Sequence, residues 1–146
     1  MGASGWDYLT TYEGDLSATL QALRQKVFDT DDYLLSQPAE PDGPPPASIE
    51  EMFEDEWVQQ SGTHSILDIV IGLADDDQDD AFGTVRLITP EESVALFGTA
   101  RPTVADFERV RGTGDFYGEL RWAGRATLLY DNDTPTHAAF WGISGD

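Results

Sequence analysis

Hydrophobic and polar positions along the first part of the chain follow two periods, one typical of a strand and one of a helix. Residues 6–13 are rich in aromatic and β-branched side chains, which favour a strand. Residues 16–28 then show a helical spacing, and Asp15 stands where an N-cap is expected. The apolar face of this predicted helix consists of Leu16, Leu20, Leu23 and Val27. The chain therefore begins, by prediction, with a strand followed by an amphipathic helix.

The middle of the chain changes character. Residues 36–47 hold five of the eight prolines, which excludes a helix or a central strand and predicts a surface loop. Ser48 and Glu51 have the spacing of a capping box, so a helix is expected to begin there. The apolar run 63–73 predicts a buried strand, paired as a hairpin with a strand at 82–89 across the acidic loop 75–80.

The second half predicts two short helices and a final pair of strands. Thr89 and Glu92 form a second capping box, and Gly98 is a typical C-cap. A further helix is expected between Pro102 and Gly112. Strands at 125–130 and 137–143 flank a turn-rich segment, which indicates a C-terminal hairpin.

These elements predict a single α+β domain of 146 residues, with a mainly antiparallel sheet and about four short helices packed on it in a single layer. Apolar residues make up 40% of the chain, enough to build a core.

The net charge of the chain excludes some classes of binding partner and favours others. Eight Lys and Arg face 28 Asp and Glu, so the net charge is −20. Such a surface repels nucleic-acid backbones and anionic membranes, and it attracts a basic protein. A genome or a salt-rich cytoplasm that favours acidic residues is an alternative origin of the same composition.

Several chemistries are not expected from the sequence. The absence of Cys excludes thiolate catalysis and Cys-ligated metals. The acidic run 75–80 lacks the alternation and the glycine of a calcium-binding loop, so no metal is expected there. No glycine-rich nucleotide loop or nucleophile elbow occurs, and no cofactor is expected. Without a secretory signal or a long apolar run, we expect a cytoplasmic protein that does not enter a membrane.

Two sets of residues are candidates for function. If the protein were an enzyme, which we do not favour, acid–base chemistry would fall to His64, Asp68, His137 and Arg86. Arg86, Arg121 and Arg125 are each expected to pair with an acid; if convergent, they would hold an anionic substrate. For protein binding, the candidate contacts are acidic residues with aromatic anchors: Glu50, Glu51, Glu54, Asp55, Glu56, Asp75, Asp76, Asp77, Asp79, Asp80, Trp57, Trp122 and Trp141.

Three segments carry a resemblance. Residues 61–69 (SGTHSILDI), 96–103 (LFGTARPT) and 120–146 (LRWAGRATLLYDNDTPTHAAFWGISGD) resemble small acidic uncharacterised proteins of high-GC actinobacteria, over about half of the chain. The resemblance implies no activity and no catalytic residue. Proteins of this type resemble immunity proteins that neutralise toxins.

The sequence therefore leaves several hypotheses. The first is an acidic interaction module, an inhibitor or immunity-type partner of a basic protein. The second is a small enzyme of specialised metabolism that uses His and carboxylate chemistry in a cavity. The third is an acidic mimic of nucleic acid, and the fourth is a domain whose charge serves no partner.

Overall fold

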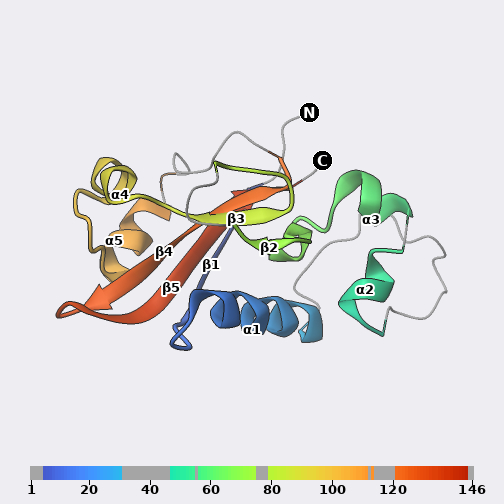
Figure 1. Ribbon diagram of the computed structural model, residues 1–146, viewed down its shortest axis with the longest axis horizontal. Coiled ribbons are helices and arrows are strands. Elements are labelled where there is room, and N and C mark those ends of the chain that lie inside the picture. Colours follow the sequence, from blue (N-terminus) through green and yellow to red (C-terminus); the bar gives the residue numbers. More distant parts are fainter. Residues whose placement is uncertain are drawn as a thin grey trace.

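A computed structural model describes residues 5–30, 47–54, 56–74, 79–111, 113 and 121–144. Its centre is a five-stranded sheet in the order β1-β5-β4-β3-β2 (Figure 1). The strands are β1 (Gly5–Thr11), β2 (Gly72–Leu73), β3 (Thr84–Leu87), β4 (Ala123–Asp131) and β5 (Thr134–Ile143). The α+β class is thereby confirmed.

The sheet is mixed, so the prediction of a mainly antiparallel sheet was wrong. The β1–β5 and β5–β4 pairs are antiparallel, whereas β4–β3 and β3–β2 are parallel. The cause is the helix pair α4 (Pro90–Phe97) and α5 (Val104–Arg111), which links β3 to β4. A crossover of this kind returns the chain to the same end of the sheet, and the next strand is then parallel.

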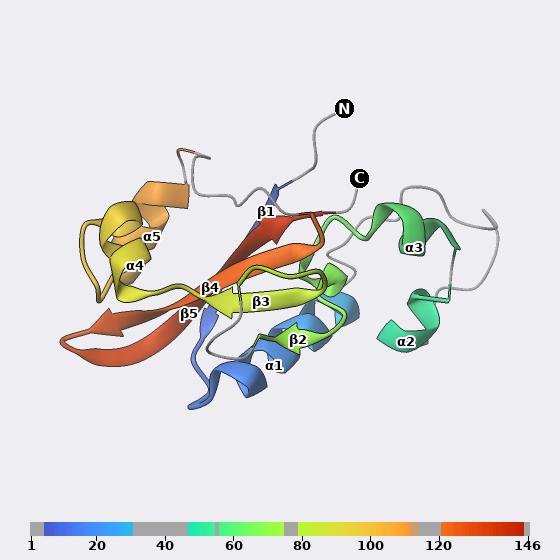
Figure 2. The same ribbon diagram turned by 45° about the horizontal axis from the view of Figure 1, so that its top comes forward.

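Helices cover both faces of the sheet, and not one face as predicted (Figure 2). The side chains of β5 alternate between two cores, as a strand requires. Ala138 and Phe140 belong to the core beneath α1 (Leu16–Asp29), whereas Ala139 and Trp141 belong to the core beneath α4 and α5. The molecule therefore has three layers, and its apolar side chains are divided between two cores.

The apolar run 63–73 is buried, but it is not the predicted strand. It contains the short 3-10 helix η1 (Ile66–Asp68), and only its end, β2, joins the sheet. Asp68 accepts hydrogen bonds from the Thr63 backbone N–H at 2.6 Å and from the Thr63 hydroxyl at 2.8 Å. This local bonding replaces a ladder, and β2 pairs with β3 in parallel, so the predicted hairpin was also wrong.

The predicted helix starts agree with the structure. The Asp15 carboxylate accepts from the Ala18 N–H at the start of α1, and Thr89 and Glu92 form both bonds of a capping box at the start of α4. Gly98 ends α4 in the left-handed conformation. The helix expected after Ser48 is divided in two, α2 (Ile49–Met52) and α3 (Glu56–Ser61).

The C-terminal hairpin of β4 and β5 is confirmed, and its turn residues Asn132 and Asp133 have φ of 50° and 68°. Two positive φ angles in succession are the signature of a tight hairpin turn. The predicted proline-rich loop lies outside the described residues apart from Ala47, as does the predicted helix stop at Gly112.

The close packing of Trp6 against β4 and β5 provides a test of the fold. The Trp6 ring lies over Gly124 and Gly142, and a Cβ atom at Gly142 would stand 2.5 Å from Trp6 Cζ2 and 2.5 Å from the Ala123 carbonyl oxygen. We expect Gly142→Ala to lower the free energy of unfolding by about 1–3 kcal/mol, measured by urea denaturation. In a Trp6→Leu background the loss is smaller, because part of the clash is removed. Equal losses in both backgrounds would show that the indole is not responsible.

Candidate functional site

An exposed apolar surface lies where the chain enters β3. It consists of Val70, Ile71, Phe82 and Trp122, and we call it the Phe82 patch. Ile71 is 69% exposed and Phe82 is 55% exposed, and the rings of Phe82 and Trp122 lie 5.5 Å apart between centroids. Large apolar side chains with this exposure are most informative when they gather in one place.

Gly83 brings the segments of the Phe82 patch together. Its φ is +74°, and an added Cβ would stand 2.9 Å from Val70 Cγ2, so a side chain does not fit. The Gly83 carbonyl accepts from the Ile71 N–H at 2.8 Å, and its N–H donates to the Trp122 carbonyl at 2.6 Å. Residues far apart in the sequence are thus held side by side by backbone bonds.

Trp122 adopts a backbone conformation that is rare for a bulky residue, with φ of 64°. Such conformations cost about 1–3 kcal/mol and persist only where the surroundings impose them. Here the Trp122 N–H donates to the Ile143 carbonyl at 3.0 Å, and its carbonyl accepts from Gly83. The sheet therefore fixes Trp122 in the geometry that places its half-buried indole against Phe82.

The predicted acidic contacts fall into three groups. Glu50, Glu51, Glu54 and Glu56 are exposed in and around α2 and α3, and Asp79 is exposed close in sequence to Phe82. Asp55, Asp75, Asp76 and Asp77 lie outside the described residues, as does the side chain of Trp57. Asp80 differs from the others because it is held in an ion-pair network.

This network, the Arg86 cluster, consists of Asp80, Arg86, Glu92 and Arg125. Arg86 and Arg125 are register partners on β3 and β4, so their side chains emerge next to each other. Asp80 accepts from Arg86 Nε at 2.9 Å and from an Arg125 terminal nitrogen at 2.6 Å. Glu92 receives a two-bond fork from Arg86, at 2.6 and 2.9 Å. Two carboxylates thus neutralise two guanidinium groups.

Hydrogen bonds within the Arg86 cluster shift its pKa values. The Arg86 guanidinium, with smaller help from Thr89, lowers the pKa of Glu92 to about 2. Desolvation tends to raise the pKa of Asp80, but its bonds to Arg125 and Arg86 together outweigh it, and the pKa is lowered. The expectation that Arg86 and Arg125 pair with acids is confirmed, and both are engaged within the protein. Arg121 is exposed where its backbone bridges to Ile143.

The candidate catalytic residues are not assembled into one site. Asp68 is fully buried in η1, whose apolar neighbours belong to the core beneath α1. Arg86 points to the opposite face of the sheet, where it meets Glu92 of α4. His64 is half-buried after α3, and His137 lies on β5 with its Nδ1 2.9 Å from the Thr136 hydroxyl. Among the described residues no group of three His, Asp or Glu side chains is arranged to hold a metal.

The aromatic anchors also separate. Trp122 lies in the Phe82 patch, whereas Trp141 is only 1% exposed and packs against Phe97 and Phe107, so its prediction as a surface anchor was wrong. An aromatic residue with apolar neighbours in the sequence does not reveal whether its strand lies at the edge or in the interior of the sheet. The strand β5 lies in the interior, between β1 and β4. Ile71 and Phe82 were missed because each lies in a predicted strand: Ile71 in the buried strand at 63–73, and Phe82 in the strand at 82–89 that was expected to pair with it.

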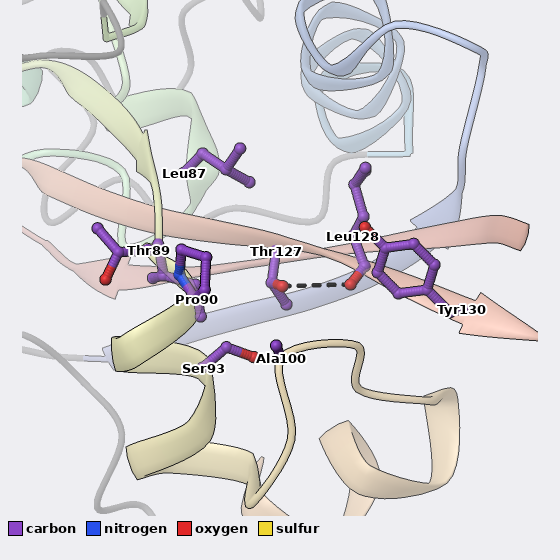
Figure 3. Close-up of a pocket in the computed structure, with 9 residues that line it drawn as sticks. Leu87, Thr89, Pro90, Ser93, Ala100, Thr127, Leu128 and Tyr130 are labelled. Carbon is purple, nitrogen blue, oxygen red and sulfur yellow. Dashed lines mark hydrogen bonds between the residues drawn. The ribbon is translucent and has the colours of Figure 1, made fainter. Parts of the chain in front are cut away.

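A concave feature separate from the Phe82 patch lies between the start of α4 and β4 (Figure 3). It is a pocket of about 190 Å³ whose lining includes Leu87, Ser93, Ala100, Leu128 and Tyr130. None of the four candidate catalytic residues lines it. It is smaller than the roughly 300–1,000 Å³ of pockets that enclose a drug-sized ligand.

The fold and the surface define a three-layer α+β protein with an exposed apolar patch, in which Asp68 and Arg86, two of the candidate catalytic residues, lie on opposite sides of the sheet. No family model, curated protein or solved structure matches the chain. None of the described helices has the length and hydropathy that crossing a membrane requires.

The lowered pKa of Glu92 predicts how stability depends on pH. A carboxylate with a folded-state pKa of about 2 stabilises the protein above its ordinary pKa of 4.5, and the benefit disappears as the pH falls towards 2. Glu92→Gln keeps a capping side chain but removes the charge. At pH 7 we expect this variant to lose about 1–2 kcal/mol, allowing for solvent screening of a partly exposed group.

The measurement is the difference in urea unfolding free energy between the wild type and Glu92→Gln across this pH range. The difference shrinks below about pH 4.5, since the wild-type carboxylate then loses its advantage over the unfolded state. Glu91→Gln, at an exposed neighbouring position, is the control for general charge removal. A difference that is constant with pH, or equal for both variants, would contradict the role of the Arg86 cluster.

Proposed function

We propose that this protein is an acidic interaction module that binds a basic protein, in the manner of an inhibitor or immunity protein. The observation that carries the proposal is the Phe82 patch: apolar and aromatic side chains stand exposed on a chain with a net charge of −20. Interfaces combine buried aromatic anchors with a charged rim, and the two requirements meet here.

The charge supports the nature of the partner. A net charge of −20 generates a field that accelerates encounter with a positively charged surface and slows encounter with an anionic one. Direct binding of nucleic acid or of an anionic membrane is therefore not part of the proposal. The exposed Asp79 and the glutamates of α2 and α3 are the described acids that act in this field.

The geometry of the Phe82 patch supports its role as the anchor. Its backbone is fixed by bonds from Gly83 to Ile71 and Trp122, so little conformational entropy is lost when a partner covers it. The enzyme alternative has less support, because Asp68 and Arg86 lie on opposite sides of the sheet. The nucleic-acid mimic requires carboxylates in duplex-like spacing, and no observation favours it.

Substitution in the Phe82 patch tests the proposal. The protein is immobilised and used to capture partners from a lysate of its own source, and basic proteins retained are identified by mass spectrometry and purified. We expect Phe82→Ser to weaken binding of the purified partner about 30-fold, as for an interface hot spot of roughly 2 kcal/mol. Val94→Ser is the matched control, because Val94 is 51% exposed but lies on α4.

Salt provides the second measurement. We expect association of the purified partner to slow as sodium chloride is raised, because screening shortens the range of the attraction. The dissociation rate should respond mainly to Phe82→Ser. Three outcomes would each count against the proposal. They are a partner that is not basic, an association rate that does not change with salt, and equal effects of Phe82→Ser and Val94→Ser.

A further inference from the structure

The edge of β4 is open where β3 ends. The last bond from the β3 side runs from the Ile88 N–H to the Ala126 carbonyl at 3.0 Å. Farther along β4, the Tyr130 N–H donates to the Pro102 carbonyl at 2.8 Å, so the segment before α5 covers that position. Between these two bonds none of the described residues forms a neighbouring strand, because the chain has turned away into α4.

Leu128 occupies the gap. Backbone groups of residues two apart point to the same edge of a strand, so the Leu128 N–H and C=O face the same side as those of Ala126 and Tyr130. Across this edge, no described residue offers a backbone partner to the Leu128 N–H. Its carbonyl receives a bond of 3.1 Å from the Thr127 hydroxyl, drawn as a dashed line in Figure 3. Such groups are normally paired with another backbone.

The pocket described above lies at this gap, and its size limits what enters. At about 190 Å³ it holds a single residue or a fragment of similar size, not a whole ligand. Leu87, Pro90 and Ala100 contribute apolar surface, and the Ser93 hydroxyl is already bonded to the Thr99 carbonyl at 2.7 Å. None of the described residues that line the pocket carries a charge. The part of a ligand that fits inside is therefore an uncharged amide with a small side chain.

On both α4 and β4, an acidic residue comes directly after a pocket-lining residue in the sequence. Glu91 comes after Pro90 on α4, Asp131 comes after Tyr130 on β4, and both are exposed. The Arg101 guanidinium lies 5.9 Å from the Tyr130 ring centroid, but it is paired with Asp133 at 3.0 Å. The excess of acids in a molecule of net charge −20 therefore still favours a positively charged chain at the pocket. Opposite charges next to a bonded strand pair stabilise the pairing.

We propose that this pocket binds one uncharged residue of an extended basic peptide segment, which forms a β-bridge with Leu128. In an antiparallel bridge one residue both donates to the Leu128 carbonyl and accepts from its N–H, so a single residue fills the gap. Lysine or arginine on either side of that residue meets the acidic surroundings. This inference rests on the proposed function, since the segment belongs to the basic partner, and it names how part of that partner is recognised.

The experiment uses the blocked tripeptide acetyl-Lys-Val-Lys-amide as the probe, titrated into the ¹⁵N-labelled protein. We expect saturable shifts of the Leu128 and Tyr130 amide signals. The same peptide with an N-methylated valine lacks the donor to the Leu128 carbonyl and should bind about fivefold more weakly, the effect of one lost hydrogen bond. The peptide acetyl-Glu-Val-Glu-amide should bind more weakly still, because its charge is repelled.

Two protein variants locate the binding. Ala100→Phe places a ring in the pocket from an exposed position and should abolish the Leu128 shift. Ala95→Phe, also exposed but on α4 outside the lining, should leave the shift unchanged. Equal binding of the N-methylated peptide, binding to Ala100→Phe, or shifts confined to the Phe82 patch would overturn the inference. If the inference is overturned but a basic protein is still captured through Phe82, the proposed function is unaffected. If the tripeptide binds at Leu128 but no basic protein is captured, the peptide site at the pocket is supported and the proposed function is not.

Discussion

Two arginines side by side on β3 and β4 impose the constraint on which the surrounding structure depends. The parallel register of β3 and β4 places Arg86 directly beside Arg125. Like charges at directly opposite positions of two strands are destabilising unless carboxylates lie between them. Asp80 and Glu92 supply these carboxylates from the segment before β3 and from the first turn of α4. The Arg86 cluster therefore fixes the chain at both ends of β3, a strand of only four residues.

The positions of the Phe82 patch and of the pocket at Leu128 both depend on how the Arg86 cluster holds the two ends of β3. Asp80 lies two residues before Phe82, so the bonds from Asp80 to the arginines hold the chain that enters the Phe82 patch. Glu92 caps α4 through Thr89 while it is bonded to Arg86, and this position turns the chain away from β4 after Leu87. The same turn opens the edge at Leu128. An arrangement that stabilises β3 thereby also shapes the surfaces at its two ends.

Local signals predicted much of the fold, and long-range pairing accounts for what they missed. The capping residues Asp15, Thr89 and Gly98 act within a few residues of themselves, so their sequence context was sufficient. The direction of β3 against β4 depends on where the pair α4 and α5 delivers the chain, which no local pattern specifies. The run at 63–73 is apolar because it is buried, but the Asp68 carboxylate and the Thr63 hydroxyl bend it into η1. Periodicity alone does not distinguish these two outcomes.

The candidate site was predictable to a similar extent. The excess of acidic residues and the candidate Trp122 could be predicted from the sequence. Ile71 and Phe82 look like core residues until the fold shows that they lie just before the short strands β2 and β3. Arg86 looked like a possible catalytic group because the chain has few cations. Because cations are few, however, carboxylates such as Asp80 and Glu92 are available to pair with Arg86 inside the protein. With eight cations against 28 acids, carboxylates greatly outnumber the possible partners.

The excess of 28 acids over eight cations bears on how the proposed basic partner would affect the stability of the fold. Repulsion among exposed carboxylates opposes the compact state, and a cationic surface laid against them relieves it, so binding and folding are stabilised together. The Phe82 patch and the pocket at Leu128 lie at opposite ends of β3, whose four residues span roughly 13 Å at about 3.3 Å per residue. An ordinary interface, with about 800 Å² buried on each partner, is wide enough to cover both. Under the proposed function, a single basic protein would insert a residue beside Leu128 while its apolar surface covers Phe82. The Arg86 cluster, which fixes the chain at both ends of β3, would hold these two contacts at a constant separation.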